Sequence, residues 1–210
     1  MGALPQAQRR GGGRRALGRC GPCRCHGRVD GRAGRAWSLQ RFETVGAFGA
    51  VVAGVLWHFV YDWSGGSPLV AAIAPANESV WEHLKLVVVP VVALGLVEAR
   101  WMADHPRLWW AKCVEVATAC TFIVAFFYTY TGALGVHGLV LVDILTFVGA
   151  VAGGQLLSYR IISSPRPAPE PVAVSVSALL LLIVLFAVLT FMPPHLPLFQ
   201  EAATGSYGPT

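Results

Sequence analysis

The sequence predicts an all-α integral membrane protein, a bundle of about five transmembrane helices that follows a disordered, Arg/Gly-rich N-terminal arm. Hydrophobic residues make up 55% of the 210 residues and charged residues 13%, whereas roughly 25% of the residues in a soluble domain are charged. So few charged groups cannot cover a water-facing surface. The hydrophobic residues gather in five long runs. Because a backbone cannot cross lipid with unpaired N–H and C=O groups, these runs are expected to be helices.

The first 41 residues differ in composition from the rest of the chain. They are dominated by Gly and Arg, contain ten of the sixteen Lys and Arg residues, and hold few large apolar side chains. Such a segment cannot bury enough surface to offset the entropy of folding. Residues 1–41 are therefore predicted to be a disordered basic arm, and translation that starts downstream of the arm is an alternative. The other cations are scattered singly, which argues against a nucleic-acid partner and for the lipid bilayer.

Residues 42–192 are predicted to form the transmembrane domain. A bilayer core requires about 20 helical residues, with roughly 17 as the lower limit. The first run has no charge until Asp62, and the second reaches spanning length only if its helix begins near Trp81. The fourth run contains Asp143, and the fifth contains no charged residue. The predicted helices cover residues 44–63, 84–97, 112–131, 137–159 and 172–192.

A helix-start signal precedes the second run. Ser79-x-x-Glu82 has the form of a capping box, which makes Val80 the first helical residue. Asn77 is an alternative cap. Pro90 removes one intrahelical hydrogen bond, so a kink is expected there.

The last segment, residues 193–210, is predicted to be a Pro-rich extracytoplasmic tail. Pro193 and Pro194 cannot extend the fifth helix, and residues 204–208 (TGSYG) are typical of a turn. Two interpretations are open. The tail is either a terminal coil or a lid that folds over the polar residues of the outer side, with His195 joining them.

The placement of the cations predicts the orientation of the helices. With a cytoplasmic N-terminus, the inside segments are 1–43, 98–112 and 160–171, and they contain fifteen of the sixteen Lys and Arg residues. This is the positive-inside pattern. The sequence thus predicts a multi-pass protein of the cell (plasma) membrane with an extracytoplasmic C-terminus. At the inner end of the third helix, Lys112 and Glu115 are expected to form an ion pair.

Polar and ionisable side chains gather at the predicted outer side. Such groups are costly in a membrane and usually face one another or a cavity. His58 and Asp143 lie at similar depths, about 7 Å and 9 Å below the interface at 1.5 Å per residue, so the two side chains can meet inside the bundle. The candidate outer cluster consists of His58, Asp62, Asn77, Glu78, Glu82, His83, Lys85, His137 and Asp143.

Each contact in this cluster has a structural and a functional interpretation. Glu82 and Lys85, three residues apart, are expected to form a cap and a surface ion pair. His58 and Asp143 form either a structural hydrogen bond between two helices or part of a functional site, which would be a metal centre, a proton relay or a substrate anchor. A divalent metal would be held by His58, His83 and Asp143, with Glu78 or Glu82 as the general base.

Four blocks of this sequence occur in the same order in a known family. They are HFVYDWSG at residues 58–65, PANESVWEHLK at 75–85, FYTYTG at 127–132 and PPHLPLF at 193–199. From about Phe42 to Gly208 the chain resembles a family of small bacterial multi-pass membrane proteins that is catalogued only as a domain of unknown function. The resemblance implies a membrane location and a fold of several helices. It implies no activity and leaves the basic arm outside.

The sequence contains none of the established catalytic motifs, neither His-Glu-x-x-His, nor Gly-x-Ser-x-Gly, nor a phosphate-binding loop. The leading hypothesis is a binding or structural membrane protein, such as an accessory subunit or a small-solute sensor, that works as a homo-oligomer or with a membrane partner protein. The second is a membrane-embedded, metal-assisted hydrolase that acts on lipid or envelope material. The third is a proton- or cation-coupled permease, which would need a polar path from Asp143 to Glu115 or Gln155.

Overall fold

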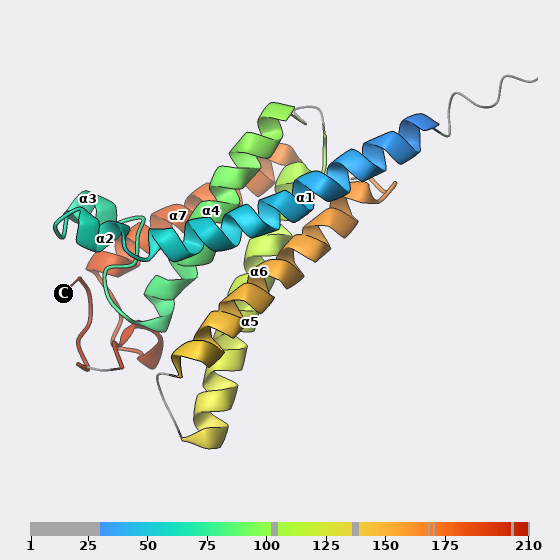
Figure 1. The fold of residues 1–210 in the computed structure, drawn as a ribbon. Coiled ribbons are helices and arrows are strands. Elements are labelled where there is room, and N and C mark those ends of the chain that lie inside the picture. Colours follow the sequence, from blue (N-terminus) through green and yellow to red (C-terminus); the bar gives the residue numbers. More distant parts are fainter. Residues whose placement is uncertain are drawn as a thin grey trace, which may run out of the picture. The chain divides into compact units, whose positions relative to one another are not determined.

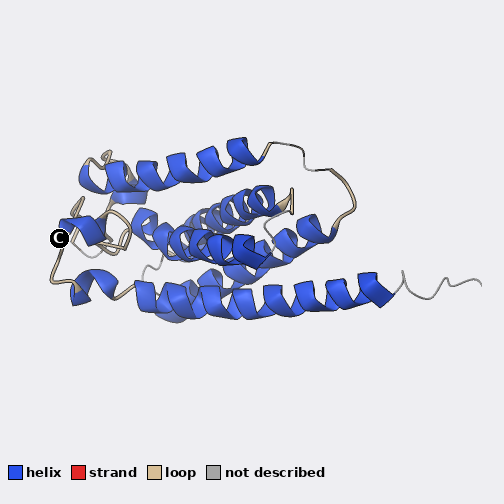
Figure 2. Cartoon of the chain, turned by 90° about the horizontal axis from the view of Figure 1, so that it is seen from above, coloured by secondary structure: helices blue, strands red, loops and turns tan. Residues whose placement is uncertain are grey.

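The computed structural model describes residues 30–101, 105–135, 139–167, 169, 171–202 and 204–209, and its description of side chains begins at residue 44. The regular secondary structure of these residues is entirely helical (Figures 1 and 2). Outside the helices, a single isolated bridge joins Gln200 to Tyr207 among the described residues. The helices are α1 (Asp30–Trp57), α2 (Val60–Trp63), α3 (Pro68–Ala71), α4 (Val80–Trp101), α5 (Leu108–Leu134), α6 (Val140–Ser163), α7 (Val172–Phe191) and the 3-10 helix η1 (Pro197–Phe199).

The chain divides into two compact units, residues 1–35 and 36–210. Of the first unit, only the start of α1 is described. Most of the predicted disordered arm, residues 1–29, therefore lies outside the described residues. Residues 30–41 of the arm are helical.

Four of the described helices, α4 to α7, are long and apolar enough to cross a membrane. The apolar part of α1, Thr44–Trp57, is shorter than the 18 residues that such a span needs. The prediction of an all-helical membrane bundle is confirmed. Many large side chains on the exposed surface of the helices are apolar, as on α7, where Leu181 is 69% exposed. A surface of this kind is stable against lipid tails and unfavourable in water.

The first apolar run is not one helix, so the prediction of a single helix over residues 44–63 is wrong. Helix α1 ends at Trp57, His58 and Phe59 form a turn, and α2 continues from Val60 to Trp63. The chain then reverses at Gly65 and Gly66, whose φ angles of 70° and 76° favour glycine. The break leaves His58 at the junction of two helices rather than inside one.

The core of the bundle lies where α4, α5, α6 and α7 meet. Helices α5 and α6 pack along each other, and α4 and α7 both pack on α5. The central residues are small or β-branched, and Val88, Val91 and Ala119 have at most 1% of their surface exposed. Ala50 brings α1 into the same cluster. Close packing of this kind fixes the positions of the helix ends that carry the polar residues.

Pro90 and Gly54 determine how α1 packs on α4. Pro90 lies inside α4 and has no N–H, so the carbonyl of Leu86, four residues earlier, lacks its intrahelical donor. Gly54 approaches this carbonyl so closely that a Cβ atom at residue 54 would lie 2.8 Å from Leu86 O and 2.5 Å from Phe147 Cζ of α6. Only a glycine fits here. His58 follows one turn after Gly54, so this contact directs His58 toward the start of α4.

The start of α4 is capped as predicted. Ser79 Oγ accepts a hydrogen bond from the backbone N–H of Glu82 at 3.3 Å, and Val80 is the first helical residue. The reciprocal half of the capping box is absent from the described contacts, because the backbone N–H of Ser79 donates instead to Asn77 Oδ1 at 2.9 Å. The Glu82 carboxylate is therefore free to reach other groups.

Candidate functional site

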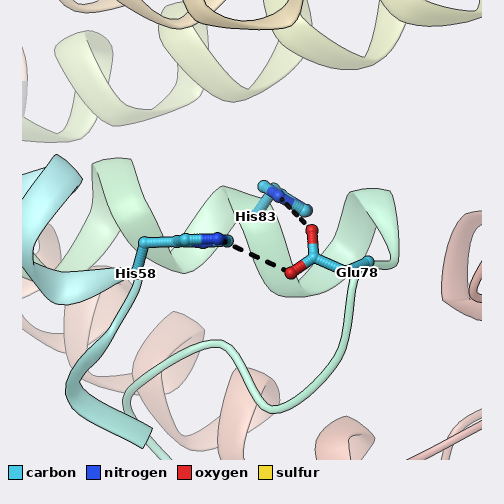
Figure 3. A group of neighbouring side chains, drawn as sticks. All are labelled: His58, Glu78 and His83. Carbon is cyan, nitrogen blue, oxygen red and sulfur yellow. Dashed lines mark ion pairs between the residues drawn. The ribbon is translucent and has the colours of Figure 1, made fainter. Parts of the chain in front are cut away.

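Three side chains at the C-terminal end of α1 and the N-terminal end of α4, the side that the sequence predicts to be outer, form a cluster of potential metal ligands. One Glu78 oxygen, Oε2, lies 3.2 Å from Nε2 of His83, and the other, Oε1, lies 3.5 Å from Nε2 of His58. One ligand atom from each residue lies within 4.8 Å of the other two. Figure 3 shows the two imidazoles on one side of the Glu78 carboxylate, both directed toward it. We call His58, Glu78 and His83 the outer triad.

Each member of the outer triad comes from a different local structure. His58 sits in the turn after α1, Glu78 ends the loop that precedes α4, and His83 lies in the first turn of α4. The loop is fastened at two points, because Trp57 Nε1 donates to Ile73 O at 2.8 Å and Asn77 Nδ2 donates to Gly208 O at 2.7 Å. The triad therefore depends on contacts between residues far apart in sequence.

The orientation of the His83 ring suits metal binding. His83 Nδ1 lies 2.8 Å from Ser79 O, and a carbonyl can only accept, so Nδ1 carries a proton. Nε2 faces the Glu78 carboxylate and, when protonated, donates a hydrogen bond to it, so a metal ion bound at Nε2 would replace that proton. A backbone carbonyl that fixes the tautomer in this way is the usual second partner of a metal-ligating histidine. The His58 and His83 rings lie 5.5 Å apart, centroid to centroid.

The electrostatic state of Glu78 follows from these neighbours. The hydrogen bond from His83 lowers the pKa of the Glu78 carboxyl below its ordinary value of 4.5, and the charges of His83 and His58 act in the same direction, against the effect of burial. Glu78 is therefore an anion at neutral pH. Its side chain is 58% exposed, and those of His58 and His83 are 29% and 35% exposed. An ion can reach the outer triad from the solvent.

The distances fit a tetrahedral metal ion. Metal–ligand distances of about 2.0–2.1 Å place the ligand atoms of a tetrahedral site roughly 3.4 Å apart. The two Glu78–His separations, 3.2 Å and 3.5 Å, are close to that value but run to different carboxylate oxygens, and one ligand atom from each of the three residues lies within 4.8 Å of the others. Two imidazoles and one carboxylate also leave one tetrahedral position for water or a substrate. This is the number of protein ligands that catalytic zinc sites have.

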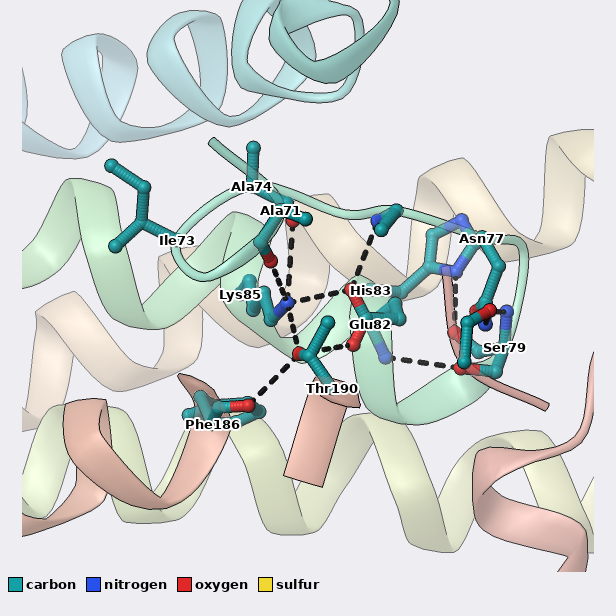
Figure 4. A network of polar contacts seen from close by, with 12 residues as sticks. Ala71, Ile73, Ala74, Asn77, Ser79, Glu82, His83, Lys85, Phe186 and Thr190 are labelled. Atoms are coloured by element: carbon teal, nitrogen blue, oxygen red, sulfur yellow. Dashed lines mark hydrogen bonds and ion pairs between the residues drawn. The ribbon is translucent and has the colours of Figure 1, made fainter. Parts of the chain in front are cut away.

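A second polar cluster lies beside the outer triad and is buried. Lys85 Nζ donates to Glu82 Oε2 at 2.6 Å, to Thr190 Oγ1 at 2.6 Å and to the carbonyls of Ala71 and Ala74 at 2.7 Å and 3.3 Å (Figure 4). The Lys85 side chain is 1% exposed and that of Glu82 is 3% exposed. The predicted ion pair is confirmed, but its predicted position on the surface is wrong, because α3 and α7 cover it.

The other hydrogen bonds of the Glu82 carboxylate argue against a role as general base. Its carboxylate accepts from the backbone N–H of Ala76 at 2.9 Å and lies 2.8 Å from the Thr190 hydroxyl, in addition to Lys85. A carboxylate with these partners joins the loop, α4 and α7 and is not free to take a proton from water. Of the two carboxylates expected as a general base, Glu82 is thus structural, and Glu78 is itself one of the potential ligands.

The structure separates the other predicted members from the outer triad. Asp143 accepts a hydrogen bond from Tyr130 Oη at 2.5 Å instead of contacting His58, although its charge still acts on His83. Asp62 is exposed in α2. Asn77 holds the loop, as described above. His137 lies outside the described residues. The predicted metal set of His58, His83 and Asp143 therefore shares two residues with the observed cluster, and Glu78 is the third.

The C-terminal tail folds against the start of α4 and is more than a terminal coil. The Trp81 ring stacks on Phe186 of α7 at 4.3 Å and lies 4.8 Å from the ring of Phe199 in η1. Together with the Asn77–Gly208 hydrogen bond, this contact holds the tail beside the outer cluster. His195 pairs with the Tyr207 ring at 4.8 Å and does not join the three residues of the triad.

Sequence reasoning missed Thr190, which joins Lys85 to Glu82, and Glu98, which joins the predicted Lys112–Glu115 ion pair at 2.9 Å from Lys112. A lone threonine near the end of an apolar helix gives no signal of its own. Glu98 could have been found, because it is the acid that directly follows the predicted span 84–97, at the end of the bundle where the Lys112–Glu115 pair was expected.

The comparisons with known proteins give a family and no activity. Residues 35–209 match a family described as "Family of unknown function (DUF6512)". No curated protein and no solved structure matches the chain. The resemblance to a family catalogued as a domain of unknown function is confirmed.

Proposed function

The chain belongs to this family of unknown function, and because membership carries no activity, we propose from the site itself that it is a membrane protein that binds a divalent transition-metal ion. The observation that supports this proposal is the outer triad. Two imidazoles and one carboxylate, contributed by three separate segments, each bring one ligand atom within 4.8 Å of the other two.

The chemistry of the ligands selects the class of ion. Imidazole nitrogen suits zinc and its transition-metal neighbours, whereas calcium and magnesium need six or more oxygen ligands. The outer triad supplies two nitrogens and one carboxylate. We therefore propose Zn²⁺ or a similar ion as the ligand, bound in competition with the protons of the two histidines.

A second candidate function is metal-assisted hydrolysis of lipid or envelope material. The observation that favours it is that the triad supplies three ligands and remains accessible, so a bound metal would keep a position for water. A metal in such a site lowers the pKa of its water to about 7 and makes it a nucleophile. The site lies at the end of the apolar helix α1 and the start of the membrane helix α4, where a lipid headgroup can approach.

We further propose that this end of the bundle faces the outside of a bacterial cell, with the chain in the cell membrane and its N-terminus in the cytoplasm. The support is the segregation of Lys and Arg, since fifteen of the sixteen lie in segments on the opposite side. A single cysteine placed at Glu78 or at Tyr207 should react with a membrane-impermeant reagent in intact cells. Reaction only after the cells are lysed would reverse the orientation.

Metal content tests the binding proposal. Protein purified without chelators and dialysed against Zn²⁺ should retain about one ion per chain, and His58→Ala or His83→Ala should lose most of it. His195→Ala is the matched control, because the His195 ring contacts the Tyr207 ring and lies outside the triad. Equal metal in the wild type and in both triad variants, or none in any of them, would rule out the proposed site.

A further inference from the structure

The opposite end of the bundle contains a buried cluster with an unusual charge balance. Lys112 Nζ on α5 lies 2.9 Å from both carboxylate oxygens of Glu98 on α4 and 3.0 Å from Oε2 of Glu115 on α5. All three side chains are at most 1% exposed. We call Glu98, Lys112 and Glu115 the inner triad.

The two buried charge clusters of the molecule differ in net charge. The outer buried pair contains one ammonium and one carboxylate, Lys85 and Glu82, and is neutral. The inner triad contains one ammonium and two carboxylates. If both carboxylates were ionised, the triad would carry a net charge of −1 inside an apolar bundle, where an uncompensated charge is strongly unfavourable.

Among the side chains that the structure describes, the other cations near this end of α4 to α7 are exposed or bonded elsewhere. Arg100 on α4 and Arg160 on α6 are exposed, and Arg107 donates to Ser164 O at the end of α6. Helix α7 contains no charged residue.

Helix α6 places a polar group against the unmatched carboxylate. Gly154 lies so close to α5 that a Cβ atom there would be 3.2 Å from Glu115 Cγ, and Ser158, one turn later, turns its hydroxyl toward the Glu115 carboxyl. Ser158 is fully buried. Neither its Oγ nor Glu115 Oε1 has a hydrogen-bond partner among the described groups. The Ser158 hydroxyl can donate to an ionised Glu115 carboxylate and accept from a protonated one, so this contact is compatible with both states.

We propose that the inner triad is a proton-binding site, in which Glu98 and Glu115 share one proton at neutral pH and Lys112 neutralises the remaining carboxylate. With that proton, the cluster becomes neutral, as the outer pair is. The proton lies on Glu115 Oε1 facing Ser158, because both oxygens of Glu98 lie against the ammonium. The ligand of this second site is thus a proton, and the site is independent of the outer triad.

Infrared spectroscopy tests the proposal, because the C=O stretch of a neutral carboxylic acid is separate from the bands of a carboxylate. Full-length protein in lipid nanodiscs at pH 7, with ¹³C in its glutamate carboxyl groups, should show a glutamic acid band that shifts with the label. Glu115→Gln and Glu98→Gln should each abolish this band, since either leaves a neutral pair. Lys112→Met should roughly double it, because two carboxyl groups then lack a cation.

The matched control is Glu82→Gln, which removes a buried glutamate that already has its own cation and should leave the band unchanged. Helix content by circular dichroism and a single size-exclusion peak identify the variants that fold. The spectrum of the labelled wild type requires no variant, so the absence of a glutamic acid band from it would overturn the proposal even where a variant fails to fold. The proposal is overturned by a wild-type spectrum with no glutamic acid band, or by a band that persists in both Glu98→Gln and Glu115→Gln.

Discussion

Two carboxylates one helical turn apart have different surroundings. Glu78 is more than half exposed and lies between two imidazoles, whereas Glu82 is buried against Lys85. The spacing of four residues places both near the same face of the α4 start, but the loop diverts Glu78 outward. One acid is therefore available to a ligand, and the other fixes the structure that holds it.

The surroundings of Glu78 predict an acid-dependent loss of stability. Because the folded state lowers the pKa of Glu78, its ionised form stabilises the protein above pH 4.5, and this contribution is lost as the pH falls through the lower folded pKa. Glu78→Gln should lower the Tm of the detergent-solubilised protein at pH 6, and the difference from the wild type should shrink as the pH falls below 4.5. A difference that is constant from pH 6 to pH 3 would contradict this assignment.

Removing one charge of the buried Lys85–Glu82 pair should lower the stability of the fold more than Glu78→Gln does. Lys85→Met leaves the buried Glu82 without its cation, and breaking one partner of a buried pair costs about 3–5 kcal/mol. Unfolding in a denaturing detergent should show a loss of this size, and the double variant Lys85→Met/Glu82→Gln should recover part of it. If Lys85→Met costs less than about 1 kcal/mol, the pair is solvated as a surface pair is.

The sequence predicted the pairing of Lys85 with Glu82 but not the burial of the pair. A spacing of three residues on one helix is a local signal. Burial comes from Thr190, which lies 105 residues away in sequence, and from the carbonyls of Ala71, at the end of α3, and Ala74, in the loop that follows. No local pattern contains that information. The same reason explains why Glu78, rather than Asp143, faces His58.

At the scale of the elements, the contact between Gly54 and Leu86 sets the position of α1. Gly54→Ala should destabilise the protein by about 1–3 kcal/mol, because the added Cβ would lie 2.8 Å from a backbone oxygen. It should also weaken metal binding, since His58 follows one turn later. Thermal unfolding and Zn²⁺ titration measure the two effects.

Gly49→Ala provides the control for that experiment. Gly49 lies on the same helix, and an added Cβ there would have no atom within 4 Å. This substitution should be neutral or slightly stabilising, by up to about 1 kcal/mol, because alanine favours a helix more than glycine does. Equal losses from both substitutions would mean that α1 does not approach α4 at Gly54.

Hydrophobic runs and one capping signal were sufficient to predict the elements. The starts of α4 at Val80 and α7 at Val172 agree with the sequence. The turn at His58 and Phe59 was not predicted, because the apolar composition continues without interruption across it and the polar residue His58 is compatible with a helix. The turn depends on how α1 meets α4, which is a tertiary contact.

At the scale of the whole bundle, polar groups form two buried layers with an apolar layer between them. Lys85 and Glu98 both lie on α4 and are separated by about 20 Å at 1.5 Å per residue. The buried residues of α4 between them, which include Val87, Val88 and Val91, are all apolar. Helix α4 thus provides no ionisable group along its buried face that would join the two layers. This arrangement favours a binding site at one end over a path through the bundle.

The coordination of a bound ion tests the central claim most directly. X-ray absorption at the zinc edge of Zn²⁺-loaded protein should show two imidazole ligands and one or two oxygen ligands at about 2.0–2.1 Å. In His83→Ala, one imidazole should be lost, while His195→Ala should keep both. A spectrum without imidazole scattering, or one that is the same in His83→Ala as in the wild type, would contradict a metal site built from His58, Glu78 and His83.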